Sequence, residues 1–152
     1  MEELKEKETY ETNQYIVIQI GEEQYGIDIR YIDNIVRMQN ITRVPKVQNY
    51  LKGVINLRGE VIPVMSIRIK MDLDEDVITR ASRIIILKME QQGNIGIIVD
   101  SVKEVVTLDA SQIEKVSYDN KAEKRNFING IGKYDGGLIS LLDLNMVVVE
   151  KE

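Results

Sequence analysis

The chain lacks two side chains on which catalysis and metal binding often depend, because its 152 residues include no histidine and no cysteine. An enzyme built from it would have to use carboxylates, lysine, tyrosine or serine. Its densest group of carboxylates is the D-L-D-E-D segment at Asp72–Asp76, which has neither the central glycine nor the later glutamate of a calcium-binding loop. We interpret the segment as a solvated linker, and we expect no catalytic residue, metal or cofactor.

One arginine stands out because it lies in a short polar turn between two apolar runs. The β-branched residues of Val54–Leu57 and Val61–Ile67 predict the strands of a hairpin that closes around Arg58, Gly59 and Glu60. Gly59 can adopt a positive φ without a Cβ penalty. Arg58 is therefore expected at the tip of a rigid hairpin, where its guanidinium can bind polar groups of a partner. The alternative is a structural role in which Arg58 caps nearby carbonyls.

Composition and charge argue against nucleic acid and a membrane as direct partners. The formal net charge of −5 and the pI near 5.0 argue against nucleic acid, whose binding depends on clustered lysine and arginine. The N-terminus has no signal-like apolar segment, and no later run approaches the roughly 18 apolar residues of a membrane span. We therefore expect a soluble cytoplasmic protein that makes no direct contact with a membrane.

The second half of the chain repeats the first. Tyr25–Val36 aligns with Ile95–Val106, and Gly53–Ile67 aligns with Gly130–Leu144. Two matches in the same order predict a duplicated unit. The alignment makes the following residues equivalent: Ile32 and Val102, Ile35 and Val105.

Each copy contains short apolar runs between turn signals such as Gly21-Glu22-Glu23, and this pattern predicts small closed β-barrels. The expected strands are Tyr15–Ile20, Gln24–Ile29, Arg43–Val44, Val54–Leu57 and Val61–Ile67, then Arg83–Met89, Ile95–Val99, Val105–Leu108, Ile128–Tyr134 and Leu138–Leu142. Brief helices are expected at Arg30–Val36 and Leu144–Val149.

The domain organisation follows from this pattern. We expect a flexible tail at residues 1–14, a first barrel at 15–74, an acidic linker at 75–82 and a second barrel at 83–152. A barrel of this size has a large surface for its volume, so the two are expected to pack on one another. Two rounded lobes leave a groove between them, and exposed apolar surface in such a groove would suit a partner.

The ordered set of motifs resembles the CheW family of chemotaxis coupling proteins along nearly the whole chain. The resemblance is carried by YGIDIRYIDNIV at Tyr25–Val36, GVINLRGEVIPV at Gly53–Val64, GIIVDSVKEVV at Gly96–Val106 and GIGKYDGGLISLLDL at Gly130–Leu144. It implies an all-β fold of two SH3-like five-stranded β-barrel subdomains with short helical segments. It also implies a non-enzymatic scaffold of two-component signal transduction, which joins the regulatory domain of the histidine kinase CheA to the cytoplasmic tips of methyl-accepting chemoreceptors. Recruitment to membrane receptor clusters would then occur through these partners.

The resemblance also assigns residues by motif. The implied receptor-binding residues are Ile32, Asn34, Arg58, Val102 and Val105, and the implied kinase-binding residues are Met38, Lys52 and Val61. Asn34 departs from family members that carry a glutamate at this position. An amide cannot form a salt bridge, so only a hydrogen bond is expected there.

Two other functions stay open on the residues alone. A small carboxylate-dependent metal-binding hydrolase would use the Asp72–Asp76 segment. An SH3/OB-like nucleic-acid-binding module would need a basic face with aromatic side chains, yet the chain has no tryptophan and a single phenylalanine, Phe127. Ile32, Val102 and Val105 have their own alternative as ordinary core residues.

Overall fold

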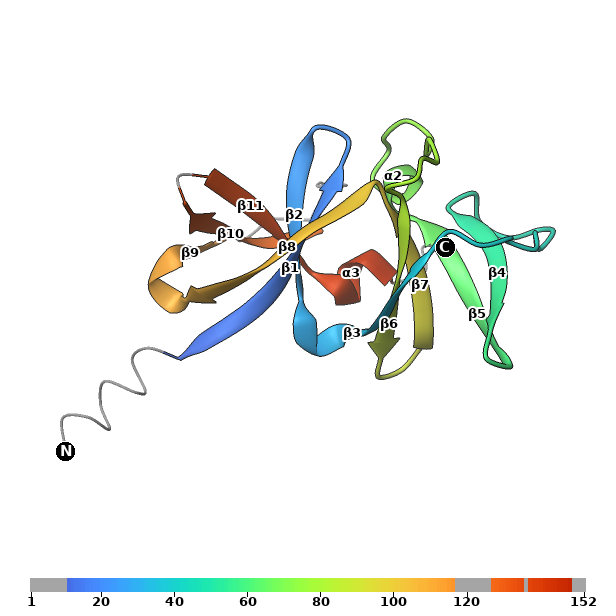
Figure 1. Cartoon of the computed structure of the whole chain (residues 1–152), viewed down its shortest axis with the longest axis horizontal. Helices are drawn as coiled ribbons and strands as arrows, with labels where there is room; N and C mark the ends of the chain where they lie inside the picture. Colours follow the sequence, from blue (N-terminus) through green and yellow to red (C-terminus); the bar gives the residue numbers. More distant parts are fainter. Residues whose placement is uncertain (1–10, 117–126, 136, 149–152) are drawn as a thin grey trace.

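The computed structural model describes residues 11–116, 127–135 and 137–148, which form two β-sheet lobes side by side (Figure 1). The six-stranded sheet has the order β8 (Ser101–Asp109), β1 (Thr12–Ile20), β2 (Glu23–Asp28), β11 (Gly137–Leu142), β10 (Ile128–Tyr134), β9 (Ile113–Lys115). The five-stranded sheet has the order β3 (Ile32–Arg37), β6 (Arg83–Met89), β7 (Gly93–Val99), β5 (Glu60–Ser66), β4 (Leu51–Leu57). The predicted class, two SH3-like lobes, is confirmed, and β9 adds a short sixth strand to one of them.

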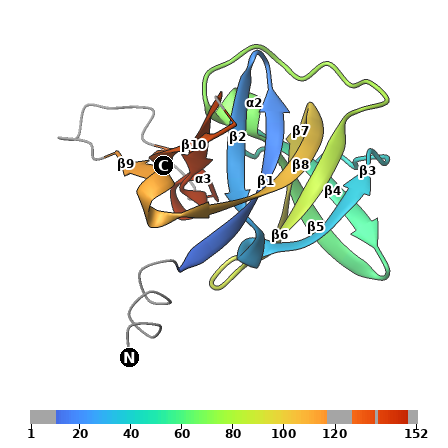
Figure 2. The same ribbon diagram turned by 60° about the vertical axis from the view of Figure 1, so that its left-hand side comes forward.

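The predicted boundaries, 15–74 and 83–152, implied two lobes that follow one another along the chain. The structure shows a different arrangement. The five-stranded sheet is built from residues 32–99 and is inserted between β2 and β8 of the other sheet. We call these the inserted lobe and the terminal lobe. The expected linker at 75–82 therefore belongs to a loop of the inserted lobe, which arches over one edge of the molecule in Figure 2. Of the expected N-terminal tail, residues 1–10 lie outside the described residues, and β1 begins at Thr12.

The helical segments are short. They comprise η1 (Ile29–Tyr31), α2 (Ile67–Lys70), η2 (Ala110–Gln112) and α3 (Leu144–Val148). The prediction of a helix at Leu144–Val149 is confirmed for the described residues, whereas the predicted helix at Arg30–Val36 is wrong after Tyr31, where β3 begins. The predicted strand at Arg43–Val44 is also wrong. These residues lie in the loop before β4. Within the described part of the chain, no helix is long and apolar enough to cross a membrane.

The strand pairing reproduces the sequence repeat. The strand orders β8-β1-β2-β11-β10 and β3-β6-β7-β5-β4 correspond strand by strand. Leu141 pairs with Gly26 in one sheet exactly where Val64 pairs with Gly96 in the other. A Cβ on Gly26 would lie 2.9 Å from Leu141 Cδ2, and a Cβ on Gly96 would lie 2.8 Å from Ile84 Cγ2. Both glycines are therefore required by close packing, which explains why the two copies retain them.

The largest of the three apolar clusters is shared by both lobes. It includes Ile18 and Ile27 from the terminal lobe, Ile85 and Ile97 from the inserted lobe, and Val147 of α3, all fully buried. Figure 1 shows α3 between the two sheets. Each lobe has only a small cluster of its own. Because most of the buried apolar surface is common to the two lobes, their relative orientation is set by packing.

An ion pair adds a polar link between the lobes. Arg68 of α2 donates to Asp100 through Nη2 at 2.6 Å and through Nε at 3.1 Å, and the Gly21 N–H donates to the same carboxylate at 2.8 Å. Asp100 lies between β7 and β8, and Gly21 lies in the β1–β2 turn. Burial raises the pKa of Asp100, but the hydrogen bonds from Arg68 and Gly21 outweigh it and hold this pKa below the ordinary value of 3.8.

This ion pair predicts a pH dependence of stability. Because the pKa of Asp100 is lower in the folded than in the unfolded protein, the link stabilises the fold above pH 3.8 and is lost as the pH falls through the folded value. We expect Asp100→Asn to lower the free energy of unfolding at neutral pH by about 1–2 kcal/mol. The difference between the two proteins should shrink on acidification below pH 3.8, as measured by urea unfolding. A difference that stayed constant with pH would contradict this role.

Candidate functional site

Arg58 lies where the sequence predicted it, at the tip of the β4–β5 hairpin. Arg58 and Gly59 have φ values of 54° and 84°, which fit a two-residue hairpin turn with two left-handed positions. The Asn56 side chain supports the turn by accepting from the Gly59 N–H at 3.2 Å. The Arg58 side chain is exposed and makes no hydrogen bond or ion pair with any residue that the structure describes. No carbonyl cap by Arg58 is seen there, so its guanidinium is available to a partner.

Ile32 and Asn34 lie on β3, an outer strand of the inserted lobe. Ile32 is half-buried and packs against the shared cluster, as does Ile35. The pairing of β3 with β6 shifts between Ile32 and Asn34, so Asp33 is an extra residue in the strand. The Asn34 Oδ1 accepts from the Ile35 N–H at 2.8 Å. The carbonyl side of this amide is thus already engaged, and its NH₂ group is the part suited to a partner.

Val102 and Val105 lie on β8, the outer strand of the terminal lobe. Here too the register shifts, and Lys103 is the extra residue at the position equivalent to Asp33. Val102 is half-buried against the shared cluster, like its repeat partner Ile32. Val105 is 50% exposed, whereas its repeat partner Ile35 is packed. The two lobes therefore present Ile32 and Val102 in similar settings, and Val105 adds an exposed apolar side chain on one lobe alone.

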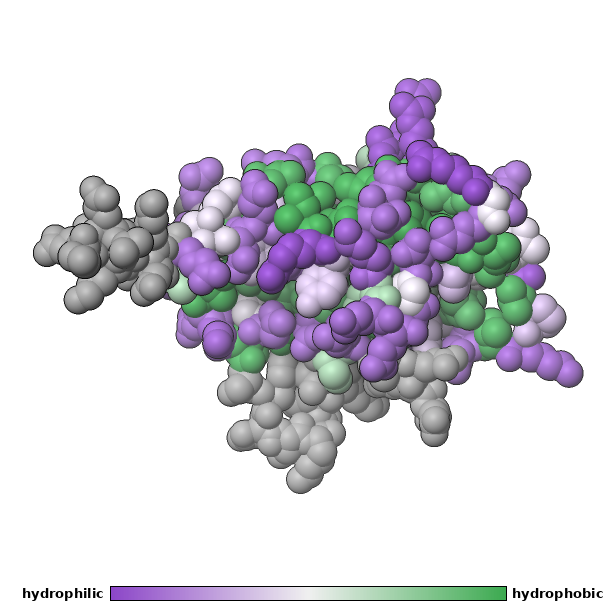
Figure 3. Space-filling view, turned by 90° about the horizontal axis from the view of Figure 1, so that it is seen from below, coloured by the Kyte–Doolittle hydropathy of each residue, from purple (hydrophilic) through white to green (hydrophobic). Residues whose placement is uncertain are grey.

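The predicted receptor-binding residues do not all meet in one place. Ile32 and Val102 pack on the shared cluster from outer strands of different sheets, and we call this apolar surface, with Val105, the seam. Figure 3 shows apolar surface gathered near the junction of the lobes and, separately, on the inserted lobe. Arg58 lies at the same end of the inserted sheet as Ile32, but β6 and β7 separate β3 from β5, a distance of about 15 Å. Arg58 therefore lies at the same end of the inserted lobe as the seam but is not part of it.

The predicted kinase-binding residues divide between two environments. Val61 is 62% exposed on β5, directly after the Arg58 turn. Met38 is half-buried against the cluster inside the inserted lobe, so part of its side chain serves the core. Lys52 is half-buried on β4 beside a hollow. Val61 is therefore the one of the three that presents mostly free apolar surface.

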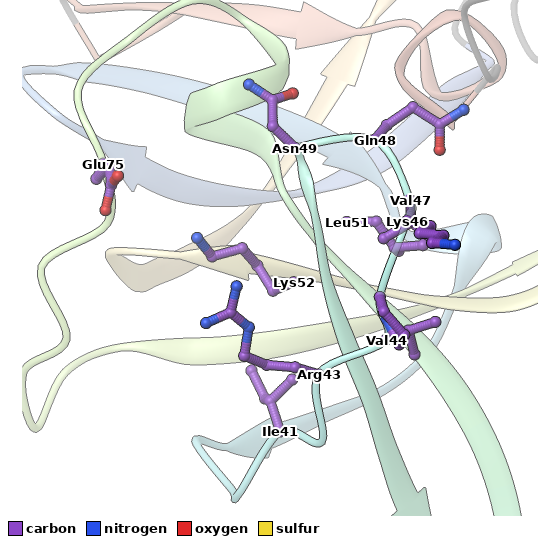
Figure 4. A pocket seen from close by; sticks show the side chains of 11 residues that line it. Ile41, Arg43, Val44, Lys46, Val47, Gln48, Asn49, Leu51, Lys52 and Glu75 are labelled. Atoms are coloured by element: carbon purple, nitrogen blue, oxygen red, sulfur yellow. The ribbon is translucent and has the colours of Figure 1, made fainter.

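One exposed residue was not predicted as part of a site, although the repeat could have revealed it. Leu138 on β11 is equivalent to Val61 and has the same exposed fraction, 62%. The hollow beside β4 was not predicted either; it has a volume of about 790 Å³ and is lined by Arg43, Lys52 and Glu75 among others (Figure 4). Apart from Glu75, its lining residues all lie between Ile41 and Lys52, a stretch in which no motif marked a binding site.

The acidic segment at Asp72–Asp76 does not form a metal site in the described residues. No three acidic side chains among them lie close enough to hold one ion. Asp76 instead accepts from the hydroxyl of the buried Ser66 at 2.5 Å, which ties the segment to the end of β5. The segment thus has a structural anchor, and the geometry gives no support to a metal-dependent hydrolase.

Comparison with known proteins agrees with this architecture. A family model described as a CheW-like domain matches residues 14–152. The chain is 36% identical to the chemotaxis protein CheW of Bacillus subtilis over 137 residues, covering 90% of this chain and 86% of that protein. It is 31% identical to CheW of Helicobacter pylori, covering 95% and 86% of the two chains. The crystal structure of the scaffolding protein TtCheW from Thermoanaerobacter tengcongensis matches with a TM-score of 0.81 and 31% identity, covering 90% of this chain and 92% of that one.

Proposed function

Because this chain belongs to the CheW family of chemotaxis adaptor proteins, which are scaffolds and not enzymes, we propose that it couples methyl-accepting chemoreceptors to the histidine kinase CheA. The proposal places the protein in the cytoplasm, at receptor clusters that it reaches through its partners. The observation that carries it is the seam, where outer strands of two lobes present apolar side chains over a shared core.

The receptor tip is proposed to bind as a helix along the seam. A helix fits a groove by placing apolar side chains on one face, and Ile32, Val102 and Val105 supply matching apolar surface. Arg58 lies at the end of the inserted lobe with its donors free of partners among the described residues. It would set the register of the bound helix through charge-assisted hydrogen bonds to carboxylates or carbonyls. The Asn34 amide can add a neutral hydrogen bond.

The regulatory domain of the kinase is proposed to bind the β4–β5 face of the inserted lobe. Val61 provides the exposed apolar contact, Lys52 a cation for acidic groups, and Met38 an adaptable edge to the lobe. This face lies on β4 and β5, whereas the seam lies on β3 and β8, so both partners can bind at once. Coupling then requires no chemical reaction. Because the core is tightly packed, the protein holds the bound receptor and the bound kinase in a fixed relative position, and a movement of the receptor changes the position of the kinase.

A reconstituted mixture tests the adaptor role directly. The purified protein should form a ternary complex with a receptor cytoplasmic fragment and the kinase. It should raise autophosphorylation of the kinase when the receptor fragment is also present, and not in its absence. Size-exclusion chromatography with light scattering measures the complex, and phosphate incorporation measures the activity. Failure to bind either partner would overturn the proposal.

The variant Arg58→Ala isolates the contribution of the guanidinium. We expect the affinity for the receptor fragment to fall about 10-fold to 30-fold, because charge-assisted hydrogen bonds are lost. Both arginine and alanine have a Cβ, so the backbone strain at the φ of 54° is the same in the two proteins. The free energy of unfolding should therefore change by less than about 0.5 kcal/mol. Titration calorimetry and thermal unfolding measure the two quantities. A loss of stability with unchanged affinity would assign Arg58 a structural role instead.

A further inference from the structure

The hollow beside β4 concentrates positive charge in an acidic protein. Figure 4 shows the side chains of Arg43 and Lys52 extending in the same direction, toward the wall that carries Glu75. Lys46 lines the same hollow, and the chain as a whole has a formal net charge of −5. Neither Arg43 nor Lys52 makes an ion pair or side-chain hydrogen bond with another described residue. The lining therefore holds three cations, Arg43, Lys46 and Lys52, against one carboxylate, Glu75, and neither Arg43 nor Lys52 is engaged in an ion pair with it.

The repeat provides a comparison within the same molecule. Thr42 bridges Val54 in the inserted lobe as Glu114 pairs with Ile131 in the terminal lobe. This register makes Lys115 the equivalent of Arg43. Lys52 is the extra residue where the pairing of β4 with β5 shifts, and Asn129 is the extra residue where the pairing of β10 with β11 shifts, so these two residues are also equivalent.

A hollow of about 730 Å³ lies at the corresponding place in the terminal lobe. Lys115 and Asn129 line it together with Arg30 and Glu11. The two hollows have similar volumes, but in the terminal lobe Asn129 replaces Lys52, and the second cation, Arg30, forms an ion pair with Asp28.

We propose that the hollow of the inserted lobe binds an acidic, extended segment of a protein partner. Carboxylates of such a segment would pair with Arg43 and Lys52, whose attraction is strengthened by the partly enclosed setting. The side-chain amides of Gln48 and Asn49 line the hollow and can bond to the backbone of an extended chain. The outer edge of β4 is already paired at Val54 with Thr42, so the segment would lie over the hollow through side-chain contacts and would not extend the sheet.

Apolar side chains at the same place favour a peptide over a simple anion. Val44 and Val47 line the hollow and are each 37% exposed, and Ile41 and Leu51 form part of its wall. An inorganic anion would leave this apolar surface in water, whereas a segment with alternating acidic and apolar residues would cover it. Among the described residues, no aromatic side chain lines the hollow, so they offer no platform on which a nucleic-acid base could stack.

The test uses the full chain and a short fluorescent peptide in which glutamates alternate with valines. A peptide with glutamine in place of glutamate is the matched control. Fluorescence anisotropy should show the glutamate peptide binding about 10-fold more tightly than the glutamine peptide, and its affinity should fall with added salt. Equal affinity for the two peptides would overturn the proposal. This measurement needs neither the kinase nor a receptor, so its failure is distinguishable from failure of the adaptor role.

Charge reversal locates the binding site. The double variant Arg43→Glu, Lys52→Glu should weaken binding of the glutamate peptide by about 10-fold or more, whereas Lys115→Glu at the equivalent place on the terminal lobe should change it by less than about 2-fold. Both positions are at the surface, and unchanged thermal unfolding would show that the variants fold. Equal effects of the two changes would overturn the assignment. Displacement of the peptide by inorganic phosphate at equal concentration would show a simple anion site and overturn it as well.

Discussion

The Val105→Asp variant is expected to fold like the original protein and to lose about 100-fold in affinity for the receptor fragment, because a carboxylate would be buried against apolar side chains without a partner. Val105 is 50% exposed on an outer strand, so in the free protein the new charge can remain in water. Calorimetric titration with the receptor fragment measures the affinity. Circular dichroism and thermal unfolding check the fold.

Val61→Asp is the matched control for this experiment. Val61 is 62% exposed and carries the same side chain on the face proposed for the kinase. We expect Val61→Asp to weaken kinase binding and to leave receptor binding within about 2-fold, the reverse of the pattern for Val105→Asp. Aggregation or a large loss of stability in Val105→Asp would place that residue in the core. An unchanged receptor affinity would move the helix away from β8.

The Gly53→Ala variant should have the largest effect on stability. Gly53 has a φ of 146°, and a Cβ there would lie 2.1 Å from the Thr42 carbonyl oxygen. That carbonyl accepts from the Val54 N–H at 2.8 Å, so relief of the clash would break the bridge that holds the loop to β4. Backbone strain and the lost bridge together should cost about 3–5 kcal/mol, a large part of the stability of a small domain.

Gly59→Ala separates backbone strain from the steric clash. Gly59 also has a positive φ, 84°, but a Cβ there would meet no atom within 4 Å. We therefore expect this variant to lose only about 1 kcal/mol. Urea unfolding of the two variants gives the difference between them. Similar losses would mean that φ alone, and not the contact with Thr42, makes glycine necessary at Gly53.

The repeat was the most informative feature of the sequence for the fold. The alignment of Gly26 with Gly96 corresponds in the structure to two glycines at equivalent places in a parallel strand pair, each with a branched side chain close to where a Cβ would lie. Local pattern cannot tell, however, which strands share a sheet. The connections after β2 and β7 are very short, and β3 and β8 cross to the opposite lobe, so consecutive copies in sequence became one lobe inserted into the other.

The wrong helix at Arg30–Val36 has a definite cause. Ile32 and Ile35 are three residues apart, which is a helical spacing on one face. The extra residue Asp33 changes the alternation of β3, so both isoleucines pack on the shared cluster while the segment remains a strand. A bulge depends on the partner strand and leaves no periodic signal of its own.

For the candidate site, local residue types predicted the turn, but the sequence did not predict which side chains are exposed or where the hollow lies. The hairpin turn followed from Gly59 and the flanking apolar runs, whereas the positive φ of Arg58 and the inclusion of Glu60 in β5 were not predicted, because arginine does not favour this conformation. Whether Val105 is exposed while Ile35 is packed could not be predicted, because the two occupy equivalent places in the repeat. The hollow at Arg43 and Lys52 was missed because Arg43–Val44 was expected to be a strand, whereas these residues belong to the loop that forms most of its wall.

The order of residues alone was sufficient for the all-β class, the duplication, the rigid turn that carries Arg58 and the absence of histidine and cysteine chemistry, since each depends on neighbours in the chain or on composition. The pairing of strands, the cluster common to both lobes and the free surface of Val105 became visible only in three dimensions. Each of these depends on contacts between segments that are far apart in the chain. Their geometry is decided when the whole chain packs at once.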